Sequence, residues 1–454
     1  SRRRFLQGSA VLGAGVAAGP LLGTSYAFAT PNDPSAGDVL VVVFLRGGAD
    51  GLSMVVPWSD DSYQDLRTSG AFDIAVPPPD VADPTNTAID LGVNVGGHDF
   101  GLHPGFGGAD GTGGLKGVWD AGHLAVVHAT GLTADVAVSR SHFEAQDYWE
   151  RTSADPNVVD GWIARHLAAV GDGSGIPAVG WGNRLPRLLR PDPTAIAMAS
   201  IDGFGVAGFT DDTGAAEVLR ALHPAGAEDP LRRQGAATLD AVDLVAAEDP
   251  GQYDDNVGLY PTEGLGAALG GGLYQIAQLI RADVGLRAAV IDIGGWDLHA
   301  SLGPVTGGPM RTQVEALSGA LTAFHDDLGP LMDEVTVVTH SEFGRTINMN
   351  GSGGTDHGRG SCCFVMSGNA NQGIWGSYPA GPLADGPEGD LHEEGGTDEV
   401  DVVALAETAI DAARHHHPDV AFELEAVPEP AVLTGSAEGL RVLLGNLLDN
   451  AATH

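Results

Sequence analysis

Two neighbouring segments of the sequence bring together side chains that bind metals or anions. Residues 339–346 are Thr-His-Ser-Glu-Phe-Gly-Arg-Thr, and residues 354–360 are Gly-Thr-Asp-His-Gly-Arg-Gly. The carboxylate of Glu342 and the imidazole of His357 are of the type that holds divalent metals, and the guanidinium group of Arg345 is of the type that binds oxyanions. A solvated ion pair at a strand end is the simpler alternative. The glycines between these groups favour a site, because they let the backbone turn tightly beside a ligand.

The elements that must position these residues are buried strands. Apolar, β-branched-rich runs predict strands at residues 38–45, 124–128, 288–293, 335–340 and 362–366. In open α/β sheets, ligands bind outside the carboxyl ends of the strands. Asp50, Asp297, His299 and Glu342 all follow such ends, and His357 lies just beyond. Oxygen and imidazole ligands delivered by separate strand ends predict a site for a divalent metal.

The order of the predicted elements indicates the fold class. Strands alternate with helical patterns, which are expected near 158–169, 203–260, 265–281 and 311–328. This alternation predicts an α/β, three-layer sandwich with a mainly parallel central sheet. Residues 68–116 are rich in Pro, Gly and Asp and are expected to form an irregular excursion.

Charge and the N-terminal segment limit the partners of this chain. Among its 454 residues, Lys and Arg number 22 and Asp and Glu number 60, so the net charge of −38 argues against nucleic acid as a partner. Residues 1–29 combine Arg2-Arg3-Arg4, an apolar Gly/Ala-rich stretch and an Ala-x-Ala site. This pattern resembles a twin-arginine signal peptide that is cleaved after Ala29. We therefore expect the Tat machinery to export the protein to a periplasmic, extracellular or cell-surface location, without a stable membrane span.

Five motifs resemble, in this order, a family of exported bacterial proteins catalogued as domain of unknown function 1501. They lie at residues 44–52, 140–147, 295–299, 341–346 and 354–358. The resemblance covers about residues 36–390, and it extends more broadly to the alkaline phosphatase and sulfatase superfamily. It therefore implies an alkaline phosphatase-like fold for this part of the chain.

The superfamily resemblance implies a set of metal ligands. These are Asp297, His299, Glu342 and His357, with Asp50 in the place of a metal aspartate of the first strand. Asp356 is either a further ligand or a carboxylate that orients His357. The implied cofactor is a divalent metal, either zinc, manganese, calcium or magnesium.

The same resemblance implies catalytic residues. Ser141 lies where related phosphotransferases keep a serine nucleophile, and Arg140 and Arg345 are candidates to hold a substrate oxyanion. Ser141 and Glu144 also fit a helix capping box, which is the structural alternative. The Cys/Ser-x-Pro-x-Arg pattern of formylglycine sulfatases is absent from the sequence. We expect a metal-dependent hydrolase that acts on small anionic phosphate or sulfate esters, or alternatively a non-catalytic exported protein on the same fold.

The C-terminal segment resembles a different family. After an acidic, glycine-rich linker at 391–399, residues 400–454 are expected to form a small, partial α+β tail. Its strands are expected at 420–427 and 431–434. Residues 443–454 are similar to the N-box helix of sensor histidine kinases, in which Asn450 would hold a nucleotide's magnesium. The glycine-rich ATP-lid motifs are absent, so we interpret the tail as a truncated kinase ATPase-like fragment, joined by a gene-model or assembly fusion. Taken alone, this tail would suggest that the protein is a sensor histidine kinase.

Overall fold

The computed structural model describes most of the chain between Asp38 and Tyr378, together with two short strands near the C-terminus. The described residues are 38–69, 72–110, 113–131, 140–153, 157–170, 175–192, 194–205, 215–224, 226, 229–376, 378, 398–401 and 432–435. The predicted export signal at residues 1–29 and the predicted N-box at 443–454 lie outside them.

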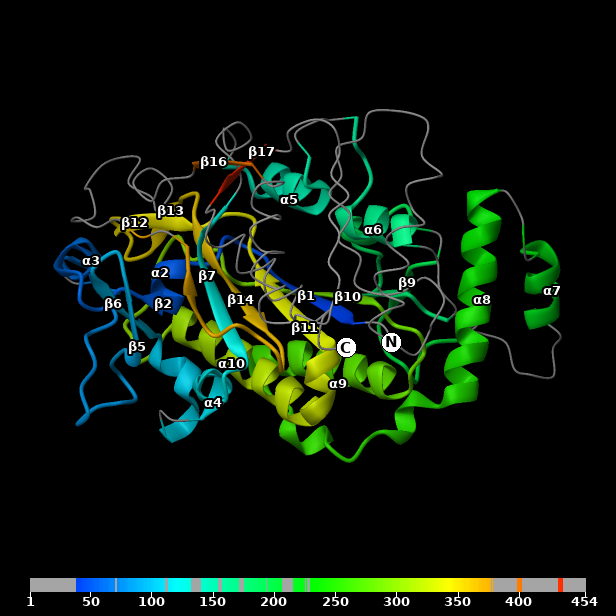
Figure 1. Cartoon of the computed structure of the whole chain (residues 1–454), viewed down its shortest axis with the longest axis horizontal. Helices are drawn as coiled ribbons and strands as arrows, with labels where there is room; N and C mark the ends of the chain where they lie inside the picture. Colours follow the sequence, from blue (N-terminus) through cyan, green and yellow to red (C-terminus); the bar gives the residue numbers. More distant parts are fainter. Residues whose placement is uncertain are drawn as a thin grey trace, which may run out of the picture.

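An eight-stranded, mainly parallel sheet forms the centre of the protein (Figure 1). Its strands, in spatial order, are β15 (Gly373–Trp375), β7 (Leu124–Thr130), β14 (Ser361–Met366), β11 (Val335–His340), β1 (Val39–Leu45), β10 (Ala288–Ile293), β8 (Ala178–Trp181) and β9 (Ile196–Met198). Only β14 runs antiparallel to its neighbours β11 and β7, and every other pair within this sheet is parallel. The predicted α/β class with a mainly parallel sheet is confirmed.

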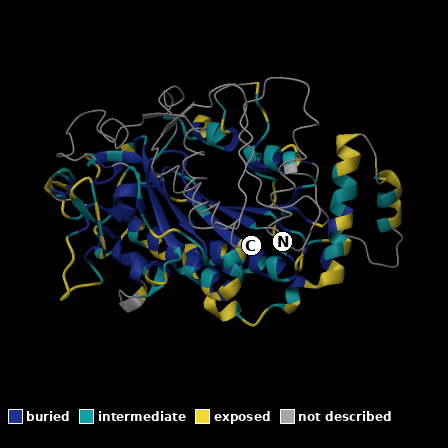
Figure 2. Cartoon of the chain, in the orientation of Figure 1, coloured by how far each residue is buried: buried dark blue, intermediate teal, exposed yellow. Residues whose placement is uncertain are grey.

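The central strand β1 is buried on both sides, which explains its unbroken apolar sequence (Figure 2). Successive side chains of a strand point to opposite faces. Val41 and Val43 therefore enter the larger core, and Leu40 and Val42 enter a smaller core on the other face. Both faces of the sheet are thus covered by packed side chains.

Helices from both halves of the chain cover the two faces. On one face lie α4 (Gly114–Asp120), α9 (Gly264–Arg281) and α10 (Pro309–Leu328), whose buried residues belong to the larger core. On the other face, Ile163 and Leu167 of α6 (Trp162–Val170) enter the smaller core, and α5 (His142–Arg151) lies beside it (Figure 1). The remaining helices are α2 (Gly51–Met54), α3 (Asp61–Arg67), α7 (Ala215–Leu222) and α8 (Pro230–Glu248). Within the described segments, no helix combines the length and the apolar character needed to span a membrane.

The predicted irregular excursion at residues 68–116 is wrong in part, because it contains a β-hairpin. Strands β5 (Ile89–Val95) and β6 (His98–Leu102) pair with each other, and β6 also pairs with β2 (Val55–Val56). Gly96 and Gly97 have φ values of 62° and 93° and connect the two strands. Such a two-residue turn needs positive φ at both positions, so the Gly-Gly pair was a hairpin signal. Two short pairs lie nearby, β3 (Thr68–Ser69) with β4 (Phe72–Asp73), and β12 (Arg345–Met349) with β13 (Thr355–His357).

The described part of the tail differs from its prediction. Strand β17 (Val432–Gly435) is observed, but its antiparallel partner is β16 (Asp398–Asp401). That partner overlaps the end of the predicted linker at 391–399 and the start of the predicted tail at 400–454. The strand predicted at 420–427 lies outside the described residues. Pairing between segments so distant in sequence has no local signal, which explains the difference.

Two buried histidines predict that the fold loses stability in mild acid. Burial lowers the pKa of His128 to about 4, and burial together with the charge of Arg311 lowers that of His103 to about 3. Both values lie below the ordinary 6.5 of an unfolded chain. The unfolded state therefore binds more protons below pH 6.5, and stability falls as the pH falls toward 4. This contribution is fully present above pH 6.5.

Urea unfolding at pH 7, 6 and 5 measures this effect. His128 packs edge-on against the ring of Phe100, with ring centroids 5.3 Å apart, so His128→Phe keeps an aromatic ring in the core. The variant should lose up to about 1.4 kcal/mol per pH unit from the slope of unfolding free energy against pH, with the full loss reached only well below pH 6.5, since one proton fewer is then taken up on unfolding. An unchanged slope would contradict the assignment of His128 as a buried neutral group.

Candidate metal centre

Three loops meet at the carboxyl edge of the sheet. They follow β1, β10 and β11, which pair in parallel and in register, so that Phe44 lies beside both Asp292 and His340. A Cβ atom on Gly47, in the loop after β1, would lie 2.5 Å from the backbone nitrogen of Asp297. Gly47 also has a φ of 127°. Only glycine therefore allows the loop after β1 to lie against the loop after β10.

Four side chains converge in front of these loops, and we call them the histidine cluster: His142, Asp297, His299 and His357. Asp297 Oδ1 lies 3.5 Å from Nε2 of His142, 3.2 Å from Nε2 of His299 and 3.7 Å from Nε2 of His357. The Nε2 atoms of His299 and His357 are 2.8 Å apart. The ligand atoms of His142, Asp297 and His357 all lie within 4.8 Å of one another. The cluster thus gathers three ring nitrogens around one carboxylate oxygen.

Each imidazole of the cluster places its other nitrogen against a hydrogen-bond acceptor. The pairs are His142 Nδ1 with Glu342 Oε1 at 2.7 Å, His299 Nδ1 with Asp356 Oδ1 at 3.1 Å, and His357 Nδ1 with the backbone oxygen of Arg140 at 2.7 Å. Because the partners are carboxylate and carbonyl oxygens, Nδ1–H donates in all three pairs, and Nε2 is the ring nitrogen that faces Asp297. Such acceptors are typical of histidines that bind a metal.

The charges at the cluster keep its acidic ligand ionised and one of its histidines neutral. Burial opposes ionisation of Asp297, but the hydrogen bond and the charge of Arg345 lower the pKa of this carboxyl below its usual value. Burial and the charges of Arg345 and the neighbouring histidines lower the pKa of His357, despite its hydrogen bond to Arg140. A carboxylate and a neutral imidazole are the protonation states that bind a metal.

Glu342, predicted as a metal ligand, lies behind the cluster and positions it. Its side chain is fully buried. The carboxylate accepts hydrogen bonds from the backbone N–H of Gly47 at 2.9 Å, from Gln146 Nε2 at 3.0 Å and from the ring of His142. Burial raises the pKa of Glu342, but these hydrogen bonds outweigh it and lower the pKa below its usual value. Because its oxygens are already engaged, Glu342 orients His142 and anchors α5, whose Trp149 also donates to the Glu342 carbonyl at 2.9 Å.

Two further predicted ligands are placed differently from the cluster. Asp50 is 3% exposed and pairs with Arg67, with Oδ2 at 2.7 Å from a guanidinium nitrogen. It also caps α2 by accepting a hydrogen bond from the Ser53 backbone N–H, so both of its carboxylate oxygens are already bound to groups of the protein. The glycine-rich insertion after β1 carries Asp50 past the strand end, and this explains the difference. Asp356 was expected to be either a further metal ligand or the carboxylate that orients His357. In the structure it pairs instead with the ring of His299.

Arg345, predicted to hold a substrate oxyanion, is buried and acts on the protein itself. Its guanidinium group donates to the carbonyl oxygens of Gly47, Gly48 and Thr355, and to Asp297 Oδ1 at 2.6 Å. The side chain is 1% exposed. Arg345 is therefore a positioning residue that joins three loops and holds the cluster carboxylate.

Ser141 and Arg140 adjoin the cluster through the backbone. Ser141 is the residue before α5, and the next residue is the cluster member His142. The side chain of Ser141 makes no capping hydrogen bond to α5, so the capping-box alternative is not formed. The Arg140 carbonyl accepts from His357. The structure thus places both residues beside members of the cluster, since the Arg140 carbonyl contacts the ring of His357 and Ser141 directly precedes His142.

His142 is the cluster residue that sequence reasoning missed. It lies in the motif at 140–147, but catalytic roles in that motif were assigned from sequence to Ser141 and Arg140 and none to His142. A signal was present, because His142 opens an amphipathic helix beyond the end of β7. The spacing to Gln146 also places both side chains on one face of that helix.

Comparison with known proteins supports the family resemblance over one part of the chain. A family model described as "Protein of unknown function (DUF1501)" matches residues 271–386. This segment contains Asp297, His299, Glu342 and His357, whereas His142 lies outside it. No curated protein matches the chain.

Proposed function

We propose that the histidine cluster binds one divalent metal ion and that the protein is an exported metal-dependent hydrolase of phosphate or sulfate esters. One observation is the main support for a metal at this place. Nε2 of His142 is buried and has no hydrogen-bond partner among the described residues. In addition, the Nε2 atoms of His299 and His357 face each other at 2.8 Å while both rings donate from Nδ1. Two acceptors at this distance repel each other unless a proton or a cation lies between them.

The donor set fits a transition metal. Two ligand atoms that are each about 2.1 Å from one metal lie roughly 3.0–3.4 Å apart at octahedral or tetrahedral angles. The contacts of 2.8 to 3.7 Å within the cluster fall around that range. Imidazole suits zinc, and carboxylate also suits manganese. Among the four metals expected from sequence, zinc and manganese therefore fit better than calcium or magnesium.

The residues around the cluster fit ester hydrolysis. A bound metal would polarise an ester oxygen and lower the pKa of a nucleophile beside it. His142, His299 and His357 would hold it, with Asp297 as the anionic ligand that Arg345 keeps in place. Ser141 is the candidate nucleophile, because it adjoins His142 at the N-terminus of α5, where backbone N–H groups favour an anion. The side chains of His299 and Asp297 are 42% and 51% exposed, so a substrate reaches the cluster from solvent.

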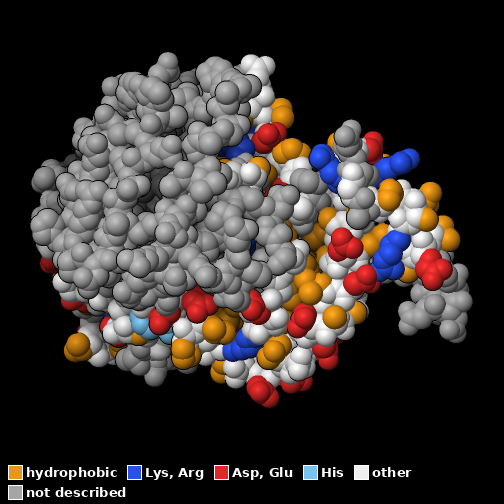
Figure 3. All heavy atoms as spheres, turned by 45° about the vertical axis from the view of Figure 1, so that its right-hand side comes forward, with side chains coloured by type: hydrophobic (Ala, Val, Ile, Leu, Met, Phe, Trp, Pro, Cys, Tyr) orange, Lys and Arg blue, Asp and Glu red, His pale blue; other side chains and the backbone are white. Residues whose placement is uncertain are grey.

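The alkaline phosphatase-like fold and the export route belong to the same proposal. The mainly parallel sheet and the cluster at its carboxyl edge agree with the superfamily resemblance. On the face in Figure 3, acidic side chains are spread over the described surface, in keeping with the net charge of −38. A small anionic ester must therefore find local positive charge near the cluster.

Metal analysis followed by an ester-substrate screen tests the proposal. Protein purified without a tag should contain about one zinc or manganese ion per chain and hydrolyse an aryl phosphate or aryl sulfate. Ser141→Ala should lower kcat by roughly 10³-fold or more while the metal content stays unchanged, as expected for loss of a nucleophile. Ser62→Ala, at the second residue of α3, is the matched control and should keep full activity. Full activity in Ser141→Ala would exclude the serine mechanism, and metal-free, inactive wild-type protein would exclude the proposed function.

A further inference from the structure

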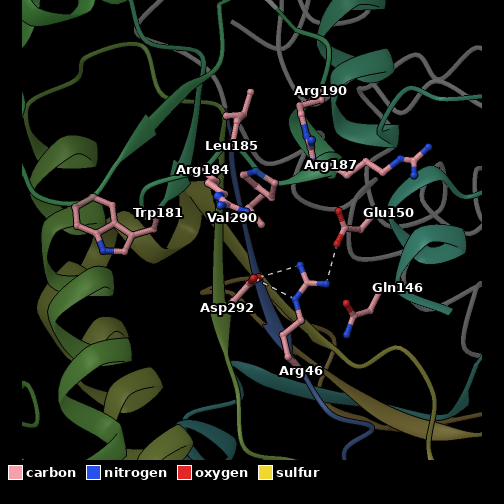
Figure 4. Close-up of a pocket in the computed structure, with 11 residues that line it drawn as sticks. Arg46, Gln146, Glu150, Trp181, Arg184, Leu185, Arg187, Arg190, Val290 and Asp292 are labelled. Carbon is pink, nitrogen blue, oxygen red and sulfur yellow. Dashed lines mark hydrogen bonds and ion pairs between the residues drawn. The ribbon is translucent and has the colours of Figure 1, made fainter. Parts of the chain in front are cut away.

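A cavity lined by four arginines opens beside α5, and we call it the arginine pocket. It has a volume of about 360 Å³, and the arginines are Arg46, Arg184, Arg187 and Arg190 (Figure 4). Arg46 follows β1, and the other three belong to the segment after β8. The pocket thus lies along the same carboxyl edge of the sheet as the histidine cluster.

Positive charge in the arginine pocket exceeds the negative charge that the described residues supply. Arg46 pairs with both acidic residues of the lining, Glu150 at 2.7 Å and Asp292 at 3.1 Å. Arg187 pairs with Asp147. Arg184 and Arg190 are exposed, and neither guanidinium group has a carboxylate partner within the described part of the chain. The four arginines thus face three carboxylates, and the two arginines without an acidic partner among the described residues indicate a place for an anion in this strongly acidic protein.

Helix α5 joins the arginine pocket to the histidine cluster. His142, Gln146 and Glu150 are spaced four residues apart and lie on one face of the helix. His142 belongs to the cluster and Glu150 to the pocket, while Gln146 lines the pocket and donates to Glu342 behind the cluster. With a rise of 1.5 Å per residue, the two ends of this row are about 12 Å apart.

We infer that the arginine pocket binds a second anionic group of the substrate while its ester lies at the histidine cluster. The use of the pocket for a substrate rests on the proposed hydrolase function. Guanidinium groups bind phosphate, sulfate and carboxylate in bidentate geometry, and the volume suits one such group with the carbon atoms that carry it. The apolar residues Leu185, Pro186 and Val290 also line the pocket and can contact those carbon atoms. The substrate class is an extended organic polyanion, with anionic groups about 12 Å apart along the row of α5.

Titration calorimetry with inorganic pyrophosphate on EDTA-treated full-length protein tests this pocket without using metal or activity. Arg184→Gln combined with Arg190→Gln should weaken pyrophosphate binding by roughly tenfold or more, because charge-assisted hydrogen bonds are lost. Arg232→Gln combined with Arg233→Gln is the matched control. It makes the same change in net charge at two exposed positions on α8 and should leave the affinity unchanged.

The outcomes separate the pocket from the proposed function. His299→Ala alters the cluster and should leave pyrophosphate binding intact, so a pocket that binds pyrophosphate in an inactive protein still supports anion recognition. Equal affinities of wild type and the Arg184/Arg190 double variant would overturn the inference. Equal losses in the two double variants would also overturn it, because the effect would then reflect net charge alone. A pyrophosphate affinity that disappears on EDTA treatment would place the anion at the metal and likewise overturn it.

Discussion

Replacing His142 by Ala should abolish stoichiometric metal binding. The change removes one of the three imidazoles of the proposed metal site and opens a path for water to the remaining donors. Because Nε2 of His142 is buried and faces Asp297 Oδ1 at 3.5 Å, no neighbouring described side chain replaces it. We expect metal affinity to fall by roughly 100-fold or more, beyond the 10- to 100-fold that loss of a supporting residue causes. Metal content after dialysis, measured by plasma emission spectroscopy, shows the effect directly, and ester hydrolysis should disappear with it.

A histidine outside the cluster controls for this result. His98 lies on β6, and its ring is 3.8 Å from Asp60. His98→Ala also removes an imidazole near a carboxylate, but it should leave one metal per chain. If His142→Ala retained the wild-type metal content, the cluster would not be the metal site, and the proposed function would lose its principal support.

Replacing Glu342 by Gln should weaken the metal site and the fold together, without removing a ligand. The buried carboxylate accepts hydrogen bonds from Gly47, Gln146 and His142. A glutamine replaces one carboxylate oxygen with an NH2 group, which would face one of these N–H donors and could not accept from it. Leaving such donors unsatisfied in the core should lower the free energy of unfolding by about 3 kcal/mol or more. Loss of the carboxylate behind His142 should weaken metal affinity by roughly 10- to 100-fold. Urea unfolding and a competitive chelator titration measure the two effects.

The Glu342 variant also separates two roles for this residue. If Glu342 only supports His142, the Glu342→Gln variant should still bind one metal per chain when metal is in excess. If Glu342 is a direct ligand, as the superfamily resemblance implied, the change should remove the site at every metal concentration. Glu315→Gln on the exposed surface of α10 is the matched control, since Glu315 is half exposed and its one ion pair within the described residues is with Arg311 four residues away. It should alter stability by less than about 1 kcal/mol.

Local patterns in the sequence are enough to predict the sheet and the edge at which the site lies. Buried parallel strands need unbroken apolar runs, so β1, β10 and β11 are visible in the sequence itself. Parallel strands also end at the same edge, which makes Asp297 and His299 neighbours of the loop after β11 before any coordinates are known. His357 follows that loop at a short distance in sequence and joins them. Three of the five motifs that carry the family resemblance, at 295–299, 341–346 and 354–358, lie within the matched residues 271–386, whereas those at 44–52 and 140–147 lie outside them.

The role of each side chain at that edge was decided only by tertiary structure. Glu342 and His142 are 200 residues apart, and which of them faces the metal position depends on how α5 docks against the loop after β11. Arg345 and Asp50 carry the residue types of a site, but Arg345 is committed to backbone carbonyls and Asp50 to Arg67. The arginine pocket likewise combines the end of β1 with the segment after β8. Residue type and spacing specify which chemistry is available, whereas the free energy of satisfying each buried polar group determines which residues supply it and which ones hold them in place.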